Sequence, residues 1–298
     1  MSLLDSLVAR ALAVTPRSVV GRVARRYIAG ETLPEALATI RGLAARGATT
    51  TVDVLGEFIR DFSEAEATAR EYESVLDALV RERLPVNVSV KLTAFGLLID
   101  RERCLALVRS LARRAADGGG FVRIDMEDSS CTDATLAVAR TLRSEGLPVG
   151  VVLQAYLRRT GDDARALAAE GMPVRLCKGI YREPPEVAFQ ERGEVRASYS
   201  RNLRVLLNGS GRVAIATHDE VLVDDARAAL HEWSVPRERY EYQMLLGVRE
   251  RLRDQLLGEG HPLRVYVPFG RAWYGYSVRR LRENPAIAGH VFRAMFGR

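Results

Sequence analysis

Short apolar and β-branched runs alternate along this chain with longer segments that have a helical period. Eight such runs follow residue 48, at 49–54, 86–92, 121–125, 149–154, 174–178, 213–218, 240–245 and 263–267. In the intervening segments, for example 63–84 and 100–120, apolar residues recur at steps of three and four, as on one face of an amphipathic helix. Strands that alternate with helices form a parallel sheet, and eight of them close a barrel. The pattern predicts an α/β fold, a (βα)8 TIM-like barrel, with an open doubly wound sheet as the alternative.

The first 46 residues have a different pattern from the rest of the chain. Thr15 and Thr32 are helix-capping residues, and each is followed within two residues by a proline, which is favoured in the first turn of a helix. We therefore expect a single domain over residues 1–298, in which residues 1–46 form an N-terminal helical segment and residues 47–298 form the catalytic barrel.

Polar and ionisable residues gather where the predicted strands end. The last positions of the eight runs hold Asp53, Lys91, Asp125, Gln154, Arg175 with Lys178, Thr217 with His218, Gln243 and Tyr266. A solvated strand end or a structural ion pair would explain any one of these residues, but not the whole set. Because the active site of a (βα)8 barrel lies at the carboxyl ends of its strands, we predict a site at this mouth.

The use of lysine supports the same location. Lysine and arginine together number 44, of which only Lys91 and Lys178 are lysine, so 44 − 2 = 42 are arginine. Both lysines lie at predicted strand ends. A chain that otherwise uses arginine for positive charge therefore needs a compact ammonium group at these two positions.

A polar stripe marks the helix predicted after the last strand. Tyr276, Arg279, Arg280 and Glu283 are spaced to lie on one helix face. A helix packed against the barrel would have an apolar stripe there, so we expect this helix to lie over the mouth. Two adjacent arginines are suited to binding a carboxylate. An exposed basic helix face is the alternative interpretation.

Composition and charge exclude several function classes. The net charge is +6, but the basic residues are spread among acidic ones, so we expect no nucleic-acid partner. Attraction to an anionic membrane surface stays open. Three separated cysteines and the lack of a basic leader predict a reduced, cytoplasmic protein. We expect neither a metal site nor a Rossmann nicotinamide site, because no zinc-type spacing and no G-x-G-x-x-G motif occur.

Eight motifs in order then resemble the monofunctional, bacterial type of proline dehydrogenase. They are SVKLTAF, RIDMED, VLQAY, VRLCKGIY, IATHDE, YQMLLG, VYVPFG and Y-x-x-R-R-x-x-E, between about residues 50 and 285. The resemblance implies an FAD cofactor and oxidation of L-proline to Δ1-pyrroline-5-carboxylate by hydride transfer to flavin N5, the first step of proline catabolism. It also implies a quinone as electron acceptor, peripheral association with the inner face of the cell membrane, and transient contact with a separate pyrroline-5-carboxylate dehydrogenase.

The resemblance also implies roles for individual residues. The expected substrate contacts are Lys91, Asp125, Tyr181, Leu245, Tyr266, Tyr276, Arg279, Arg280 and Glu283, where Lys91 and the arginine pair hold the carboxylate. The expected flavin contacts are Gln154, Arg175, Lys178, Gly179, Thr217 and His218, with Arg175 near the N5 edge. Lys91, Asp125, Arg175, Tyr266, Arg279 and Arg280 form the expected catalytic set. Glu57 resembles an acid that pairs with an arginine of the last helix as a gate.

Two other functions remain open from the residues alone. Lys91 or Lys178 at a strand end would suit a Schiff-base aldolase, in which Arg279 and Arg280 bind a carboxylate or phosphate. A basic membrane- or nucleic-acid-binding scaffold would explain the charge but not the polar mouth. The C-terminal segment 287–296, with apolar and basic residues, is compatible with an interfacial helix or with packing onto the barrel.

Overall fold

The computed structural model describes residues 21, 26–274 and 277. Most of the predicted N-terminal helical segment and the predicted last helix lie outside these residues. In the described part, eight parallel strands pair in chain order and close, because β1 pairs with both β2 and β8. The strands are β1 (Thr49–Val54), β2 (Asn87–Lys91), β3 (Phe121–Asp125), β4 (Val149–Gln154), β5 (Val174–Cys177), β6 (Val213–Ala216), β7 (Tyr240–Leu245) and β8 (Leu263–Phe269). The predicted (βα)8 barrel is confirmed and the open sheet is excluded.

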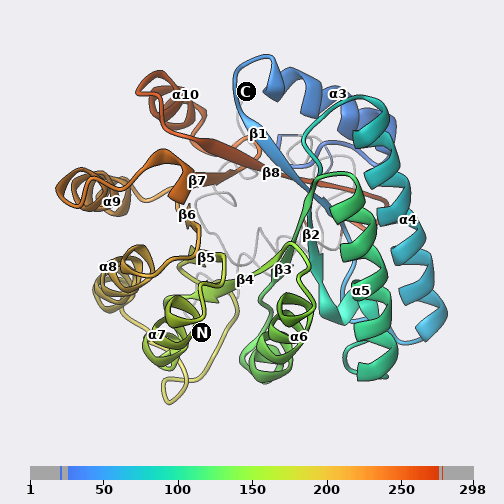
Figure 1. Ribbon diagram of the computed structural model, residues 1–298, viewed down its shortest axis with the longest axis horizontal. Helices are drawn as coiled ribbons and strands as arrows, with labels where there is room; N and C mark the ends of the chain where they lie inside the picture. Colours follow the sequence, from blue (N-terminus) through green and yellow to red (C-terminus); the bar gives the residue numbers. More distant parts are fainter. Residues whose placement is uncertain (1–20, 22–25, 275–276, 278–298) are drawn as a thin grey trace, which may run out of the picture.

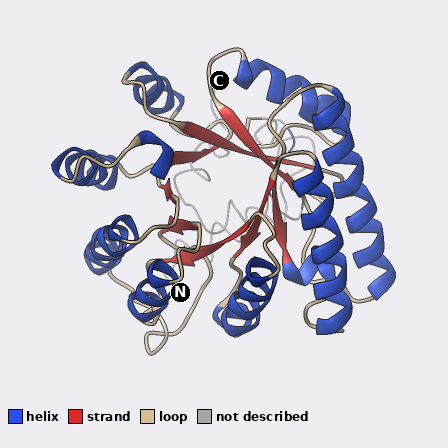
Figure 2. Cartoon of the chain, viewed as in Figure 1, coloured by secondary structure: helices blue, strands red, loops and turns tan. Residues whose placement is uncertain are grey.

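Helices surround the barrel, with the strands at its centre (Figures 1 and 2). They are α3 (Leu33–Ala44), α4 (Phe62–Arg81), α5 (Arg101–Asp117), α6 (Thr132–Ser144), α7 (Thr160–Ala169), α8 (Arg192–Asn208), α9 (Glu220–Glu232) and α10 (Glu250–Gly258). The part of the chain that the structure describes also has three short 3-10 helices, η1 (Leu92–Phe95), η2 (Ser129–Cys131) and η3 (Arg237–Arg239). Within the described ranges, no helix is long and apolar enough to span a membrane.

Local capping explains where several helices begin. At α3, the Glu35 carboxylate accepts a hydrogen bond from the Thr32 backbone N at 3.0 Å, as the cap predicted from Thr32 and the following proline requires. Asp61 accepts from the Ser63 backbone N at 2.7 Å before α4. Asp100 does the same for the first turn of α5. The caps of α4 and α5 follow βα loops, so they also fix where those loops end at the barrel mouth.

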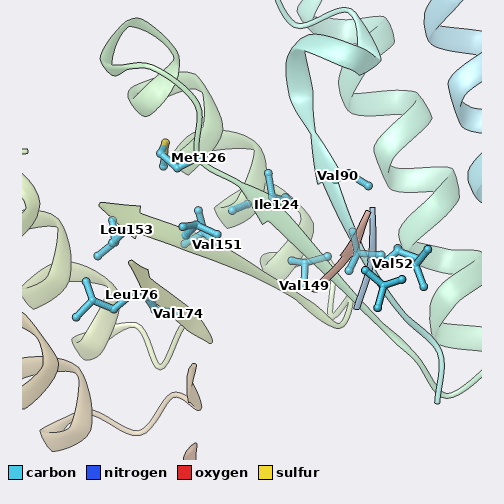
Figure 3. Close-up of a cluster of buried hydrophobic side chains, with 14 of the residues drawn as sticks. Val52, Val90, Ile124, Met126, Val149, Val151, Leu153, Val174 and Leu176 are labelled. Atoms are coloured by element: carbon cyan, nitrogen blue, oxygen red, sulfur yellow. The ribbon is translucent and has the colours of Figure 1, made fainter. Parts of the chain in front are cut away.

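Strand residues alternate between an apolar layer and a polar barrel interior. Val52, Val90, Ile124, Val151 and Leu176 belong to the buried apolar core (Figure 3). The neighbouring positions point to the other face of the sheet, because side chains alternate along a strand. These positions hold Thr51, Asp53, Ser89, Lys91, Arg123, Asp125, Arg175, Glu241, Gln243 and Arg264, all buried. Branched apolar residues usually fill such a barrel, so this interior is unusually polar and its charges need partners.

Candidate active site

Lys91 forms a buried ion pair at the mouth of the barrel. It is the last residue of β2, and its Nζ donates hydrogen bonds to Asp53 Oδ1 at 2.8 Å and to Tyr266 Oη at 3.3 Å. Asp53 is fully buried, and its Oδ2 has no hydrogen-bond partner among the described residues. Burial raises the pKa of Asp53 above its ordinary value, although the charge of Lys91 opposes the rise. The pair thus depends on a carboxylate that is costly to keep ionised.

The same network continues through Tyr266 to Asp125 and Arg175. The Tyr266 hydroxyl donates to Asp125 Oδ2 at 2.9 Å, and Arg175 Nη1 donates to Asp125 Oδ1 at 2.6 Å. The Arg175 guanidinium carbon also lies 5.4 Å from the centre of the Tyr266 ring. Four of the predicted site residues, from β2, β3, β5 and β8, are therefore brought together in one hydrogen-bonded cluster.

Arg175 is held from two further directions. Its Nη2 donates to Ser89 Oγ at 2.9 Å, and its Nε donates to Gln243 Oε1. Gln243 Nε2 in turn donates to Glu241. Bonds from β5 to β2, β3 and β7 are possible only across the barrel interior, so they confirm that these side chains point inward.

The predicted flavin-binding residues line the ends of β4, β5 and β6. Gln154 Nε2 donates to the Glu127 backbone O at 2.8 Å. His218 Nε2 accepts from the Leu245 backbone N at 2.9 Å, which places Leu245 next to the β6 end. Thr217 Oγ1 accepts from the Asp219 backbone N at 3.1 Å. These contacts fix the strand ends around the mouth.

Asp219 is surrounded by three cations. Lys178 Nζ lies 3.2 Å from Asp219 Oδ2, Arg196 contacts both carboxylate oxygens at 2.9 and 2.7 Å, and Arg192 Nη2 lies at 3.7 Å. Burial alone would raise the pKa of Asp219, but hydrogen bonds and charge from Arg196 and Lys178 lower it to about 2. One carboxylate against three cations leaves an excess of positive charge beside the β5 and β6 ends.

The long connection between β5 and α8 is tied to the neighbouring loops of the mouth. Phe189 N donates to the Tyr156 backbone O at 2.8 Å, and the Ser129 backbone N donates to Glu183 Oε1 at 2.7 Å. The second residue of the connection is Gly179, whose φ is +106° and where an added Cβ would lie 2.0 Å from the Tyr156 ring. The connection includes Tyr181, a predicted substrate contact. Glycine is therefore required where the chain turns out of β5.

The comparisons with known proteins identify the family of this chain. A family model for proline dehydrogenase matches residues 36–293. The chain is 34% identical over 272 residues to proline dehydrogenase 1 of Bacillus subtilis, covering 91% of this chain and 90% of that protein. It is also 34% identical over 284 residues to the proline dehydrogenase of Deinococcus radiodurans, covering 94% of this chain and 92% of that protein. The chain belongs to the proline dehydrogenase family.

A solved structure supports the fold of this family. Proline utilization A from Bdellovibrio bacteriovorus matches with a TM-score of 0.82 and 28% identity, over 93% of this chain and 34% of that one. The chain thus spans about a third of that longer protein. The resemblance and the enzyme class expected from the motifs, an oxidoreductase that is a proline dehydrogenase, are confirmed.

Of the two residues in the predicted gate, only Glu57 is among the residues that the structure describes. Glu57 lies in the β1–α4 loop, partly buried. This loop is tied to the next by the Phe58 backbone N, which donates to Thr93 Oγ1 at 3.0 Å, and Thr93 N donates to Glu127 at 3.0 Å. The remaining predicted substrate residues, Tyr276, Arg279, Arg280 and Glu283, lie outside the described residues. Their roles, and the pairing of Glu57 with an arginine, stay predictions.

Several residues of the cluster were not among the expected site residues. Ser89 and Glu241 each lie two positions before another polar strand residue, in S-x-K and E-x-Q. Polar residues at alternate positions of a strand in a parallel sheet are the signal for them, since such strands are otherwise apolar. Arg192 and Arg196 are four residues apart in the first turns of α8, and nothing local indicates that both reach Asp219.

Proposed function

We propose that this chain oxidises L-proline to Δ1-pyrroline-5-carboxylate with FAD as its cofactor and a quinone as the electron acceptor. The observation that carries the proposal is the hydrogen-bonded cluster of buried Lys91, Asp125 and Arg175 with partly buried Tyr266 at the mouth of the barrel. In a member of the proline dehydrogenase family, such a cluster offers a cation for a carboxylate and polar groups around a small ring.

The substrate side of the proposal rests on the chain's own residues. Lys91, held by Asp53 at 2.8 Å, presents an ammonium group to the proline carboxylate, and Arg279 with Arg280 complete the carboxylate site. Tyr266 and Leu245 limit the space for the ring. Fixing the carboxylate orients the ring carbon that loses hydride, and positioning of this kind lowers the barrier to reaction.

The residues at the ends of β4, β5 and β6 fit FAD. The positive excess of Lys178, Arg192 and Arg196 around Asp219 suits a diphosphate, which basic side chains bind through charge-assisted hydrogen bonds. Arg175, with Gln154, Gly179, Thr217 and His218, would hold the flavin, and its guanidinium would stabilise negative charge near the N5 edge. When bound, FAD supplies the hydride acceptor.

The aldolase alternative is less favoured. A Schiff-base lysine must attack as a neutral amine, whereas Lys91 pairs with Asp53 and Lys178 pairs with Asp219. Neither lysine is presented as a free nucleophile. Family membership points the same way.

We also propose a cytoplasmic protein that associates peripherally with the membrane that holds its quinone, and that passes its product to a separate pyrroline-5-carboxylate dehydrogenase. The C-terminal segment is the proposed membrane contact. Truncation after Pro285 is expected to abolish binding to anionic liposomes while dye-linked activity is retained. Unchanged liposome binding would contradict this assignment.

The experiment for the main proposal begins with the absorbance spectrum of the purified protein. We expect flavin absorbance that bleaches when L-proline is added without oxygen, together with an amine-trappable pyrroline product. A colourless protein that is inactivated by borohydride in the presence of a carbonyl substrate would overturn the proposal in favour of the aldolase.

A further inference from the structure

Glu241 is a buried carboxylate that the proposed mechanism does not use. It is the second residue of β7, four residues before the strand ends at Leu245. Glu241 therefore lies about 13 Å below the mouth, measured along the strand. Glu241 accepts hydrogen bonds from Arg264 Nε at 2.8 Å and from Arg212 Nη2 at 3.0 Å. Burial alone would raise the pKa of Glu241, but the charges of Arg264 and Arg212 lower it to about 2. Two guanidinium groups that donate to its oxygens therefore hold Glu241 in its ionised form.

An ionised Glu241 determines which way the amide of Gln243 points. A carboxylate only accepts hydrogen bonds, whereas an amide has one accepting and one donating end. Gln243 must therefore present Nε2 to Glu241, which leaves its Oε1 for the Nε of Arg175. The flipped amide would set oxygen against carboxylate and N–H against N–H, so it is excluded as long as Glu241 is charged and within reach.

The orientation of Gln243 in turn affects the guanidinium of Arg175. Asp125 and Ser89 bind the two terminal nitrogens, at 2.6 and 2.9 Å, and Gln243 binds Nε. Three contacts from three strands define the guanidinium plane. Only the contact to Nε depends on an amide that is able to flip.

We propose that Glu241 is a positioning residue, whose carboxylate orients the Gln243 amide and thereby holds the Arg175 guanidinium in the plane that it needs beside the flavin. This inference rests on the proposed function, because the place of Arg175 at the flavin belongs to that proposal. It assigns a role in the reaction to a side chain at the opposite end of the barrel interior.

A purely structural role is the competing explanation, in which Glu241 only neutralises Arg264 and Arg212. Glu241→Asp separates the two roles. The aspartate keeps the negative charge beside the arginines, but its carboxylate is about 1.5 Å further from Gln243. The contact to Arg264, made by the same carboxylate oxygen, lengthens as well, and the stability measurement reports that loss. Arg212→Gln is the matched control, because it removes a charge partner of Glu241 on the half-exposed side without touching Gln243.

Three measurements are made on each purified, flavin-loaded variant: kcat and KM for L-proline, the midpoint potential of the flavin, and stability to urea. In Glu241→Asp we expect kcat to fall on the order of tenfold with little change in KM. The midpoint potential should fall in the same direction as in Arg175→Met, because a displaced cation stabilises the reduced flavin less well. Arg212→Gln should lose stability but keep kcat and the potential.

A double-mutant cycle decides whether Glu241 acts through Arg175. If it does, Glu241→Asp will not lower kcat or the potential further in the Arg175→Met background, whereas independent effects would add. The exchange Glu241→Gln with Gln243→Glu provides a rescue. In this double variant the glutamine at position 241 accepts a hydrogen bond from Arg264 and donates one to the glutamate at position 243. That glutamate accepts from Arg175, so we expect a higher kcat than in Glu241→Gln alone.

The inference is overturned if Glu241→Asp has the kcat and midpoint potential of the wild type. It is equally overturned if its full effect persists in Arg175→Met, or if the exchange does not raise kcat above that of Glu241→Gln. The exchange still decides the matter if Glu241→Asp fails to fold. Failure of the wild type to bleach with L-proline would instead refute the proposed function, which is a separate result.

Discussion

Lys91 Nζ lies 2.8 Å from Asp53 Oδ1, and the two side chains are only 10% and 0% exposed. One partner is the predicted carboxylate-binding lysine, and the other, Asp53, is the last but one residue of the neighbouring strand β1. Breaking a buried ion pair leaves an uncompensated charge, which is more costly than losing an exposed pair. The position of the Lys91 ammonium therefore depends on Asp53.

Replacing Asp53 with asparagine is expected to lower kcat/KM for L-proline. The ammonium of Lys91 loses a charged hydrogen-bond partner, an effect of roughly 1.5–3 kcal/mol, or about tenfold to a hundredfold. Flavin content should stay at the wild-type level, because Asp53 contacts the lysine and not the cations around Asp219. Steady-state kinetics with flavin absorbance on the same sample checks both statements, and wild-type kinetics would contradict the first.

The same pair predicts an acid limb in the pH profile of kcat/KM. Since burial raises the pKa of Asp53, the carboxylate takes up its proton at a pH above the ordinary 3.8 of an aspartate. Above that raised pKa the ion pair is intact, and below it Lys91 loses its counter-charge, so kcat/KM should fall as pH decreases through it. Asp53→Asn should lack this limb. An identical limb in both proteins would assign it to another group.

The two lysines are expected to respond differently to substitution. Lys91→Met should weaken L-proline binding while flavin content survives, whereas Lys178→Met should lower FAD retention before it alters KM. Lys→Arg at each position is the matched test, because a guanidinium retains the charge but not the compact shape. If both arginine variants kept wild-type kinetics and full flavin occupancy, the placement of the lysines at strand ends would be without consequence.

Tyr266 is expected to discriminate against hydroxyproline. If Tyr266 lines the ring pocket as proposed, its phenol ring would fill the space that an added hydroxyl needs, and Tyr266→Ser should then raise kcat/KM for hydroxyproline relative to that for proline. Tyr266→Phe is the control, because it removes the 2.9 Å hydrogen bond to Asp125 but keeps the ring. A ratio that shifts equally in both variants would show that the hydroxyl, and not the bulk of the ring, is responsible.

Gly179→Ala is expected to reduce both stability and FAD retention. The residue has a φ of +106°, and a Cβ there would lie 2.0 Å from the Tyr156 ring, so the turn that carries Lys178 must shift. Strain in the left-handed region alone costs about 1–2 kcal/mol. Gly193→Ala is the control, because a Cβ added there would meet no described atom within 4 Å outside its own helix backbone and chain neighbours. Thermal unfolding and the flavin content of the two variants should differ clearly.

Much of the fold was predictable from local pattern. The strand at 49–54 was predicted with its observed bounds, because the alternation of Val52 and Val54 with polar residues is a property of the strand itself. The strands at 174–178 and 213–218 were predicted too long and end at Cys177 and Ala216. The strand at 263–267 was predicted too short, because β8 continues to Phe269 in register with β1.

The mouth residues follow from the same local information. In a parallel barrel all strands point one way, so a polar residue at a strand end, such as Lys91 or Tyr266, must reach the mouth. What the sequence alone determined was therefore the strands, their alternation with helices and the end of the sheet at which polar residues gather. Closure into a barrel was predicted against an open sheet, and the pairing of β1 with β8 decided it.

Only the tertiary structure decided which side chains meet. Arg175 reaches Ser89, 86 residues away, and Gln243, 68 residues away, because closure of the barrel sets the relative height of its strands. Asp219 likewise meets Arg196 across the gap between two βα units. The period of a strand tells which face a residue occupies, but its partner across the barrel depends on the register of every strand between them.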